Sequence, residues 1–182
     1  MKLVVLDRDG VINVWHPDGV ATPDQWEPIA GSLEAIVRLN LSGYRVVVAT
    51  NQSGIARGLF DLGDLHAVHR KLHNALDSLG GRVDAILYCP HRDGDECDCR
   101  KPKPGMLHDV ARRLDTELVN VPVVGDALRD MQAAMAVGAR PYLVRTGKGA
   151  TTLAQNPALA QQIEVCNDLA EVVDQLLSNT ET

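Results

Sequence analysis

The fold of this chain is decided by the stretch Leu3-Val4-Val5-Leu6-Asp7-Arg8-Asp9-Gly10-Val11-Ile12-Asn13. Its apolar beginning predicts a buried parallel strand, which ends at two carboxylates, Asp7 and Asp9. Open α/β sheets bind ligands outside the carboxyl ends of their strands. Two acidic side chains at such a point repel each other unless a cation or a proton compensates them. The stretch therefore predicts a cation-assisted site, although two solvated acids in a surface loop would also fit it.

The composition is that of an ordinary globular protein. The 182 residues are 45% hydrophobic and 23% charged, which predicts a single domain over residues 1–182. No apolar run approaches the ~18 residues that a membrane helix needs, and the first one reaches Asp7 too early for a signal peptide. We therefore expect a cytoplasmic protein without a membrane partner. We also expect a monomer. The net charge of −6 and the 3% of aromatic residues argue against nucleic acid as a partner.

Apolar patterns typical of strands and helices alternate along the chain. Strands are expected at residues 3–6, 45–49, 83–88, 121–124, 140–144 and 163–166, and helices at 31–41, 61–80, 105–114, 128–137 and 168–177. Residues 14–30 are expected to form a flap over the first strand, and residues 145–160 a loop. This alternation predicts an α/β fold with a doubly wound, mostly parallel sheet.

Polar side chains lie at or just after the ends of three expected strands, and in the loop that follows a fourth. They are Asp7, Asp9, Thr50, Arg100, Lys101 and Asp126. Because the carboxyl ends of parallel strands share one edge of the sheet, we expect these side chains to converge in one crevice. Three kinds of group together favour phosphoryl transfer: carboxylates that hold a metal, a hydroxyl, and an ammonium.

Each residue of this group has a plausible chemical role. Asp7 could attack phosphorus as a nucleophile, and Asp9 could protonate the leaving oxygen and then deprotonate water. Asp126 and Asp7 could hold Mg²⁺, a hard cation that prefers oxygen ligands. Taken singly, Thr50 could equally be a helix cap and Lys101 a surface cation.

The sequence then resembles a known family. Asp7-Arg8-Asp9-Gly10, Thr50-Asn51-Gln52, Lys101 and Gly125-Asp126-x-x-x-Asp130 are similar to the four motifs of the haloacid dehalogenase phosphatase superfamily. The stretches 51–58, 99–106 and 144–148 resemble, within it, the D-glycero-D-manno-heptose 1,7-bisphosphate 7-phosphatases. That resemblance implies a Rossmann-like fold without a large cap domain, and a phosphatase of sugar phosphates that supplies heptose for lipopolysaccharide or nucleotide-activated heptose.

The resemblance also implies roles for individual residues. Asp7 would be the nucleophile and Asp9 the acid and base. The Mg²⁺ ligands would be Asp7, Asp126 and the carbonyl of Asp9. Thr50 and Lys101 would hold the transferred phosphoryl group, and the substrate contacts would come from Asn51, Gln52, Ser53 and Arg100. Ala127 departs from the pattern, because heptose phosphatases often carry a lysine there. Asp130 is expected to orient the metal site without being a ligand.

A second candidate metal site lies in the loop 89–99. Its pattern is Cys89-x-His91-x₅-Cys97-x-Cys99, the ligand set of a closed tetrahedral zinc site. Four protein ligands leave no position for water, so the predicted role of Zn²⁺ is structural. Cys99 directly precedes Arg100 and Lys101, so the zinc would fix the loop that carries both cations.

The remaining cysteine and the histidines have simpler interpretations. Cys166, among apolar neighbours, is expected to be a buried core side chain. His66, His69 and His73 are expected to face solvent on the helix 61–80. His16, in the predicted flap, could touch substrate, although loop histidines are usually only solvated.

Two other functions remain open at this point. The sister family, the histidinol-phosphate phosphatases, shares the zinc loop. A phospho-accepting receiver domain also places acidic residues, a threonine and a lysine around Mg²⁺ on a doubly wound sheet. Against the receiver domain stand the zinc loop and the one-residue spacing of Asp7 and Asp9.

Overall fold

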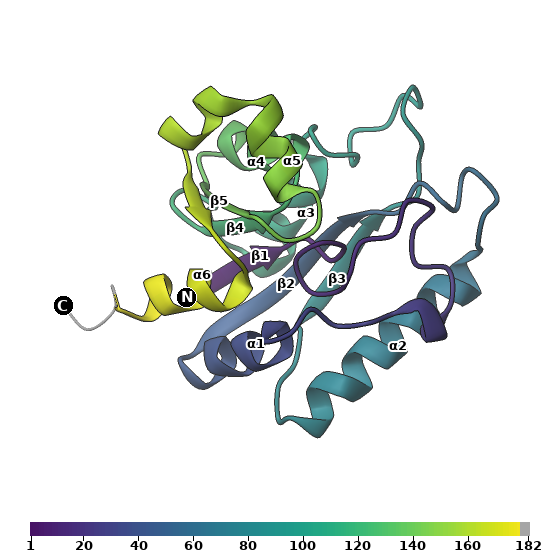
Figure 1. The fold of residues 1–182 in the computed structure, drawn as a ribbon, viewed down its shortest axis with the longest axis horizontal. Coiled ribbons are helices and arrows are strands. Elements are labelled where there is room, and N and C mark those ends of the chain that lie inside the picture. Colours follow the sequence, from purple (N-terminus) through teal and green to yellow (C-terminus); the bar gives the residue numbers. More distant parts are fainter. Residues whose placement is uncertain (179–182) are drawn as a thin grey trace.

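A computed structural model describes residues 1–178 (Figure 1). Its centre is a six-stranded sheet in the order β3-β2-β1-β4-β5-β6, and every neighbouring pair of strands is parallel. The strands are β1 (Lys2–Leu6), β2 (Tyr44–Asn51), β3 (Ala85–Cys89), β4 (Pro122–Gly125), β5 (Arg140–Val144) and β6 (Glu164–Cys166). The strand order runs outward in both directions from the pair β1 and β4, which is the doubly wound arrangement predicted from the sequence.

Helices cover both faces of this sheet, as the ribbon shows (Figure 1). On one side lie α1 (Ser32–Leu41), α2 (Leu62–Ser78) and α6 (Leu169–Ser178). On the other side lie α3 (Gly105–Leu114) and α4 (Leu128–Ala136), and α5 (Gly149–Gln155) follows β5. The short 3₁₀ helices are η1 (Pro23–Gln25) and η2 (Pro157–Gln161).

Strand β1 shows why the central strands are apolar along their whole length. Val4 and Leu6 pack into the core beneath α1, α2 and α6, whereas Leu3 and Val5 pack into the core beneath α3 and α4. Successive side chains of a strand point to opposite faces, so a strand covered on both faces must be apolar at every position. This confirms the interpretation of the stretch that opens the sequence.

The predicted loop at residues 145–160 is wrong, because it contains α5 and η2. Helix α5 consists of Gly149-Ala150-Thr151-Thr152-Leu153-Ala154-Gln155 and buries only Gly149 and Thr152. A helix that buries so little apolar surface shows no amphipathic period in its sequence. The other predicted elements are present with ends that shift by a few residues, and Cys166 is buried, as expected.

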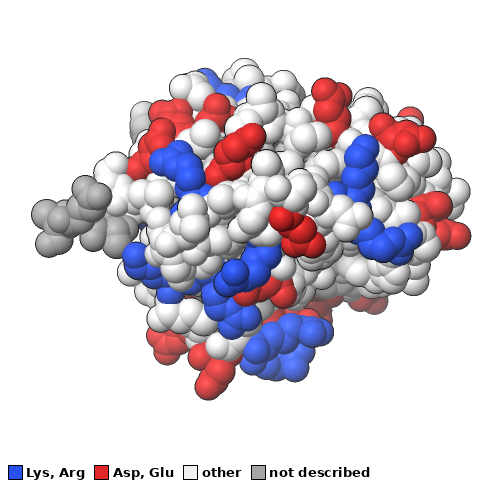
Figure 2. Space-filling view, turned by 90° about the horizontal axis from the view of Figure 1, so that it is seen from below, with Lys and Arg blue, Asp and Glu red and all other residues white. Residues whose placement is uncertain are grey.

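Two observations describe the helices and one face of the molecule (Figure 2) over residues 1–178. Among residues 1–178, no helix is long and apolar enough to cross a membrane. On the face shown in Figure 2, basic and acidic side chains are interspersed. The predicted single domain extends to residue 182, and residues 179–182 lie outside the described part; the single domain stays a prediction.

Candidate active site

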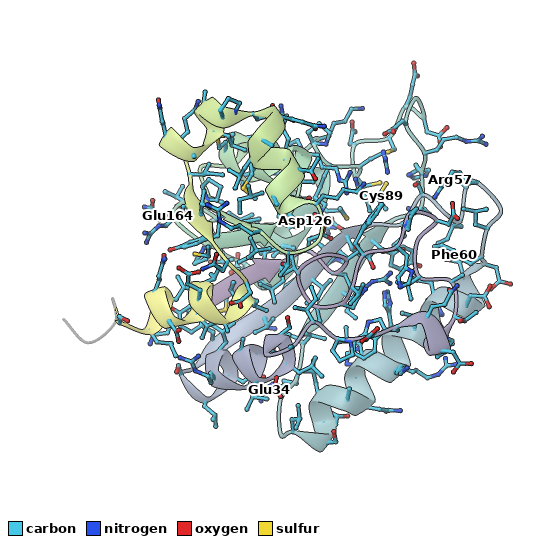
Figure 3. All side chains as sticks on the ribbon, viewed as in Figure 1. Glu34, Arg57, Phe60, Cys89, Asp126 and Glu164 are labelled. Atoms are coloured by element: carbon cyan, nitrogen blue, oxygen red, sulfur yellow. The ribbon has the colours of Figure 1, made fainter. Side chains whose placement is uncertain are left out.

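The site lies where the strand order reverses, between the carboxyl ends of β1 and β4. Asp7 and Asp9 follow β1, and Asp126 follows β4. Gly10 allows these two loops to approach, because it has φ +86° and a Cβ there would lie 2.1 Å from Asp126 Oδ2. In Figure 3, Asp126 and Cys89 mark the region where loops follow the strands β4 and β3. Such a reversal point is where open α/β sheets bind their ligands.

Three buried carboxylates meet at this point. Oxygen atoms of Asp7, Asp126 and Asp130 lie within 4.8 Å of one another, an arrangement that could hold a metal ion. Burial, and then the Asp7 and Asp130 carboxylates, raise the pKa of Asp126 to about 7. Burial also raises the pKa of Asp7, although Lys101 opposes this shift. Crowded carboxylates ionise fully only beside a cation, and Mg²⁺ fits a set of oxygen donors.

Lys101 is the buried cation of the site. Its Nζ lies 3.2 Å from Asp7 Oδ1 and 2.7 Å from Asp130 Oδ1, and it donates a hydrogen bond to the carbonyl of Ala49 (2.8 Å). Burial lowers the pKa of Lys101, but the Asp130 and Asp7 carboxylates outweigh this and raise it above its ordinary value. The lysine is therefore a permanent ammonium beside Asp7.

Two side chains hold Lys101 in this position. Asp130 accepts a hydrogen bond from the backbone N–H of Ala127 (3.0 Å) at the beginning of α4. This bond fixes the carboxylate, whose other oxygen lies beside Lys101. The side-chain amide of Asn51 donates to the Lys101 carbonyl (3.0 Å) and accepts from its N–H (3.2 Å). The family resemblance implies that Asn51 contacts substrate. Here its amide bonds to the lysine backbone, and the residue also lines the cleft, so the substrate contact stays a prediction.

Asp9 is held as an anion by its neighbours. Arg8 Nη2 lies 3.0 Å from Asp9 Oδ1 and 3.1 Å from Oδ2, and the side-chain amides of Asn13 (2.9 Å) and Gln52 (2.8 Å) also donate to this carboxylate. Burial would raise the pKa of Asp9, but Arg8 and these hydrogen bonds lower it overall. Gln52 also donates to the Thr50 hydroxyl (2.9 Å). Because its amide bonds to both Asp9 and Thr50, Gln52 links the loop after β1 to the end of β2.

A cleft of about 410 Å³ opens above these groups. Asp7, Asp9 and Thr50 line this cleft, as do Trp15 and His16 of the predicted flap. The cleft is also lined by the predicted substrate residues Asn51, Gln52, Ser53 and Arg100, and by the cations Arg57, Arg92, Arg129 and Lys148. A volume of this size suits a small molecule, and the cations suit an anionic one.

Arg129 is a cation that sequence reasoning missed. It lies in the first turn of α4, two residues after Ala127, and its Nε is buried without a hydrogen-bond partner among the described residues. The signal available in the sequence was its place three residues after Asp126, where the first turn of the expected helix borders the site. The missing lysine at position 127 therefore does not leave this side of the cleft without a positive charge.

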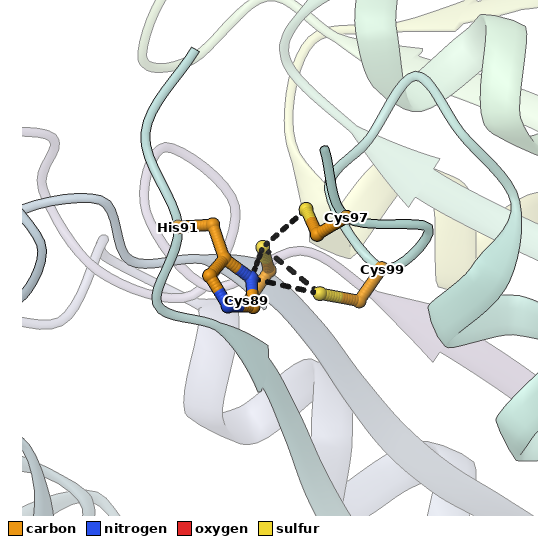
Figure 4. A group of neighbouring side chains, drawn as sticks. All are labelled: Cys89, His91, Cys97 and Cys99. Atoms are coloured by element: carbon orange, nitrogen blue, oxygen red, sulfur yellow. Dashed lines mark hydrogen bonds between the residues drawn. The ribbon is translucent and has the colours of Figure 1, made fainter. Parts of the chain in front are cut away.

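The four predicted zinc ligands lie together beside the cleft (Figure 4). Cys89 Sγ is 3.2 Å from Cys99 Sγ, 3.9 Å from Cys97 Sγ and 3.6 Å from His91 Nδ1. Burial and the bond with Cys99 raise the pKa of the Cys89 thiol to about 12, so thiolates at this point require a cation. The donor set of three sulfurs and one imidazole nitrogen fits zinc.

His69 corrects a sequence prediction. It was expected to face solvent, but it is only 8% exposed, and its Nε2 lies 3.2 Å from Arg8 Nη1. His69 falls four residues after Leu65 and three before Leu72, so it belongs to the buried stripe of α2. The spacing of His69 from Leu65 and Leu72 could be read from the sequence, but histidine is a polar residue and was therefore assigned to the exposed face.

Comparisons with known proteins agree with this fold and site. Residues 98–172 match the HAD-hydrolase-like family model, so this part of the chain is similar to HAD-like hydrolases. A D-glycero-β-D-manno-heptose-1,7-bisphosphate 7-phosphatase of Bordetella bronchiseptica is 55% identical over 177 residues, which cover 97% of this chain and 98% of the relative. A phosphatase of the same name from Pseudomonas aeruginosa is 49% identical over 97% of this chain and 98% of the relative. The chain belongs to the D-glycero-β-D-manno-heptose-1,7-bisphosphate 7-phosphatase family.

Solved structures point the same way. A crystal structure of the D,D-heptose 1,7-bisphosphate phosphatase from B. bronchiseptica, complexed with magnesium and phosphate, has a TM-score of 0.95 and covers 98% of this chain and 99% of that one. The corresponding enzyme from Burkholderia thailandensis has a TM-score of 0.78, 49% identity, and coverage of 98% and 99%. The fold is therefore that of the B. bronchiseptica phosphatase, which was crystallised with magnesium and phosphate.

Proposed function

We propose that this protein is a Mg²⁺-dependent phosphomonoesterase that removes the 7-phosphate of D-glycero-β-D-manno-heptose 1,7-bisphosphate. The observation that carries the proposal is the convergence of Asp7, Asp126 and Lys101 beneath a cation-lined cleft. A carboxylate held beside a permanent ammonium is suited to attack an anionic phosphate, because the ammonium offsets the charge repulsion. The names of the relatives supply the substrate.

In the first step, an oxygen of Asp7 attacks phosphorus and the bond between phosphorus and the sugar oxygen breaks. Asp9 gives its proton to that leaving oxygen, so the sugar departs as a neutral alcohol. The Lys101 ammonium and the Thr50 hydroxyl stabilise the charge that develops on the transferred phosphoryl oxygens. Asp7, Asp126 and the Asp9 carbonyl would hold Mg²⁺, which would further neutralise the charge of the phosphate oxygens.

In the second step, the Asp9 carboxylate takes a proton from water, and the water oxygen attacks the phosphorus of the aspartyl phosphate. The bond between phosphorus and Asp7 breaks, inorganic phosphate leaves, and Asp7 is an anion again. The anion of Asp9 that Arg8 stabilises here is the form that this step needs. The first step needs its acid, which a bound phosphate favours, because a neighbouring negative charge raises the pKa of a carboxyl.

The cations of the cleft suit a second phosphate on the substrate. Arg100 donates to the carbonyl of His91 (3.2 Å) and lies 2.7 Å from the exposed Asp93, so its guanidinium is held at the cleft wall. Arg57 and Arg129 line the same cleft, and Ser53 offers a hydroxyl. A guanidinium binds a phosphate bidentately, which makes these residues the proposed handles for the 1-phosphate.

We also propose that Cys89, His91, Cys97 and Cys99 hold a structural Zn²⁺. Such an ion would fix the loop that leads directly into Arg100 and Lys101. A monomer, a single domain and a cytoplasmic location remain predictions from the sequence.

The proposal is tested by phosphate release from both anomers of heptose 1,7-bisphosphate and from histidinol phosphate, with Mg²⁺ present. We expect kcat/KM to be about a hundredfold higher for the bisphosphate, since a charge-assisted contact contributes up to ~3 kcal/mol. Equal or faster hydrolysis of histidinol phosphate would assign the protein to the sister activity. Mass spectrometry of the quenched enzyme should find the added phosphate on Asp7.

A further inference from the structure

His69 connects a helix far along the chain to the loop that carries the catalytic carboxylates. Its Nε2 lies 3.2 Å from Nη1 of Arg8, and its ring lies beside Tyr88, with centroids 6.3 Å apart. Both His69 and Arg8 are buried, at 8% and 0% exposure. The imidazole therefore lies between the end of β3 and the loop after β1, in a position that packing fixes.

The direction of the hydrogen bond follows from its partners. A guanidinium only donates, so His69 Nε2 accepts and its ring proton must be on Nδ1. Burial and the Arg8 charge lower the pKa of His69 to about 3. The imidazole is thus neutral near neutral pH and keeps the lone pair that the contact needs.

Arg8 passes this constraint on to Asp9. Its Nε and Nη2 donate to the Asp9 carboxylate at 3.3, 3.0 and 3.1 Å, whereas its Nη1 points to His69. A buried guanidinium that lost its acceptor at Nη1 would carry unsatisfied donors, and it would shift to find others. A shift of Arg8 would move or reorient the Asp9 carboxylate with it.

We propose that His69 is a positioning residue that holds Arg8, and through Arg8 the Asp9 carboxyl, at the angle and distance that proton transfer requires. The inference rests on the proposed acid role of Asp9. His69 touches neither substrate nor metal in this scheme. Its effect should be largest where the reaction depends most on the acid, which is the departure of a poor leaving group.

The test compares two aryl phosphates in Mg²⁺ buffer. Phenyl phosphate releases a weakly acidic phenol and needs protonation, whereas p-nitrophenyl phosphate releases a stable phenolate and needs little. The quantity is kcat/KM, which covers the steps up to phosphorylation of Asp7 and leaves out the later hydrolysis. The variants are His69→Leu, His69→Met and His69→Gln, and His66→Leu is the control on the exposed face of α2.

We expect His69→Leu or His69→Met to lower kcat/KM for phenyl phosphate by about tenfold or more, and for p-nitrophenyl phosphate by about threefold or less. His69→Gln places an oxygen near the position of Nε2, so it should stay within about threefold of the wild type on both substrates. The control should match the wild type. The melting temperature identifies the variants that remain folded, and His69→Met serves if His69→Leu does not fold.

Equal losses on the two substrates in a folded apolar variant, or no loss on either, would overturn the proposal. A folded His69→Gln variant that is as impaired as the apolar variants would also overturn it, because a hydrogen-bond acceptor for Arg8 would then not restore activity. Both substrates lack the sugar, so this result is independent of the heptose assignment. An enzyme inactive on heptose bisphosphate but showing the expected contrast would refute the proposed substrate and leave the role of His69 intact.

Discussion

Two clusters of side chains that could hold a metal ion lie at the same edge of the sheet, and they differ in nearly every physical respect. The carboxylate cluster is formed by Asp7, Asp126 and Asp130, and all three side chains are buried. The Cys/His cluster, formed by Cys89, His91, Cys97 and Cys99, is buried only at Cys89. The first contains hard oxygen donors and a buried lysine, and the second contains soft sulfur donors.

The difference shows what each cluster is suited to do. Asp7 also lines the cleft, so an ion bound to it can meet a substrate. In the Cys/His cluster the four side chains already supply the four ligands that tetrahedral zinc takes, which leaves none for a substrate. The two clusters are joined through Cys99, Arg100 and Lys101, so we expect the second cluster to act on catalysis only through the position of these cations.

The largest expected effect comes from Asp7. An amide in place of the carboxylate cannot attack phosphorus, so Asp7→Asn should lower kcat by about a thousandfold or more. The substitution also removes a negative charge from a crowded buried group, so the melting temperature should not fall. Initial rates of phosphate release and a thermal melt check both expectations.

Zinc content separates the two clusters in the same variant. Elemental analysis should give about one zinc per chain in the wild type and in Asp7→Asn alike. An active Asp7→Asn enzyme would refute the covalent mechanism. Loss of zinc together with activity would show that the two clusters are one structural unit.

Much of this arrangement was visible in the sequence. The doubly wound sheet follows from apolar runs that alternate with amphipathic helices. Residue type and spacing predict the Cys/His cluster, as in Cys89-x-His91, and they predict Asp7 and Asp126 as a pair that could hold a metal. The contact between Arg8 and His69 was not visible, because it depends on how distant elements pack. A buried arginine between two aspartates has a partner on α2, 61 residues away, and no local pattern encodes that pairing. Asn51 likewise bonds to Lys101, 50 residues away, and the sequence alone suggested a substrate contact.

Arg100 provides the next largest effect, since it stands between the clusters. If its guanidinium binds the remote phosphate, Arg100→Ala should reduce the preference for heptose bisphosphate over p-nitrophenyl phosphate by up to about a hundredfold. Turnover of p-nitrophenyl phosphate, which has no second phosphate, should change much less. Arg112→Ala, on the exposed side of α3, is the matched control. An equal loss on both substrates would place Arg100 at the transferred phosphoryl group.

Cys97→Ala tests the Cys/His cluster directly. Loss of one thiolate should release zinc and loosen the loop before Lys101, which should lower kcat/KM by about tenfold, because small misplacements of catalytic groups are costly. Cys166→Ala is the control, since it removes a buried thiol from the opposite core without touching the cluster. Zinc analysis and kinetics on both variants give the answer. A zinc-free Cys97→Ala protein with full activity would show that the cluster does not position the cations.

The smallest expected effect is a difference between the two clusters in how metal binding depends on pH. Burial, Asp7 and Asp130 place the pKa of Asp126 at about 7 when no metal is bound, so a falling pH adds a proton that Mg²⁺ must displace. Between about pH 8 and about pH 6.5, the Mg²⁺ concentration for half-maximal activity should therefore rise about fourfold, with weaker binding at the lower pH. Zinc content should stay constant over this range, because bound thiolates resist protonation far more strongly. Magnesium titrations of activity at several pH values, with zinc measured in parallel, test both statements. A magnesium requirement that does not change with pH would mean that Asp126 is already ionised without its metal, because the charges of Lys101 and Arg129 compensate the carboxylate cluster.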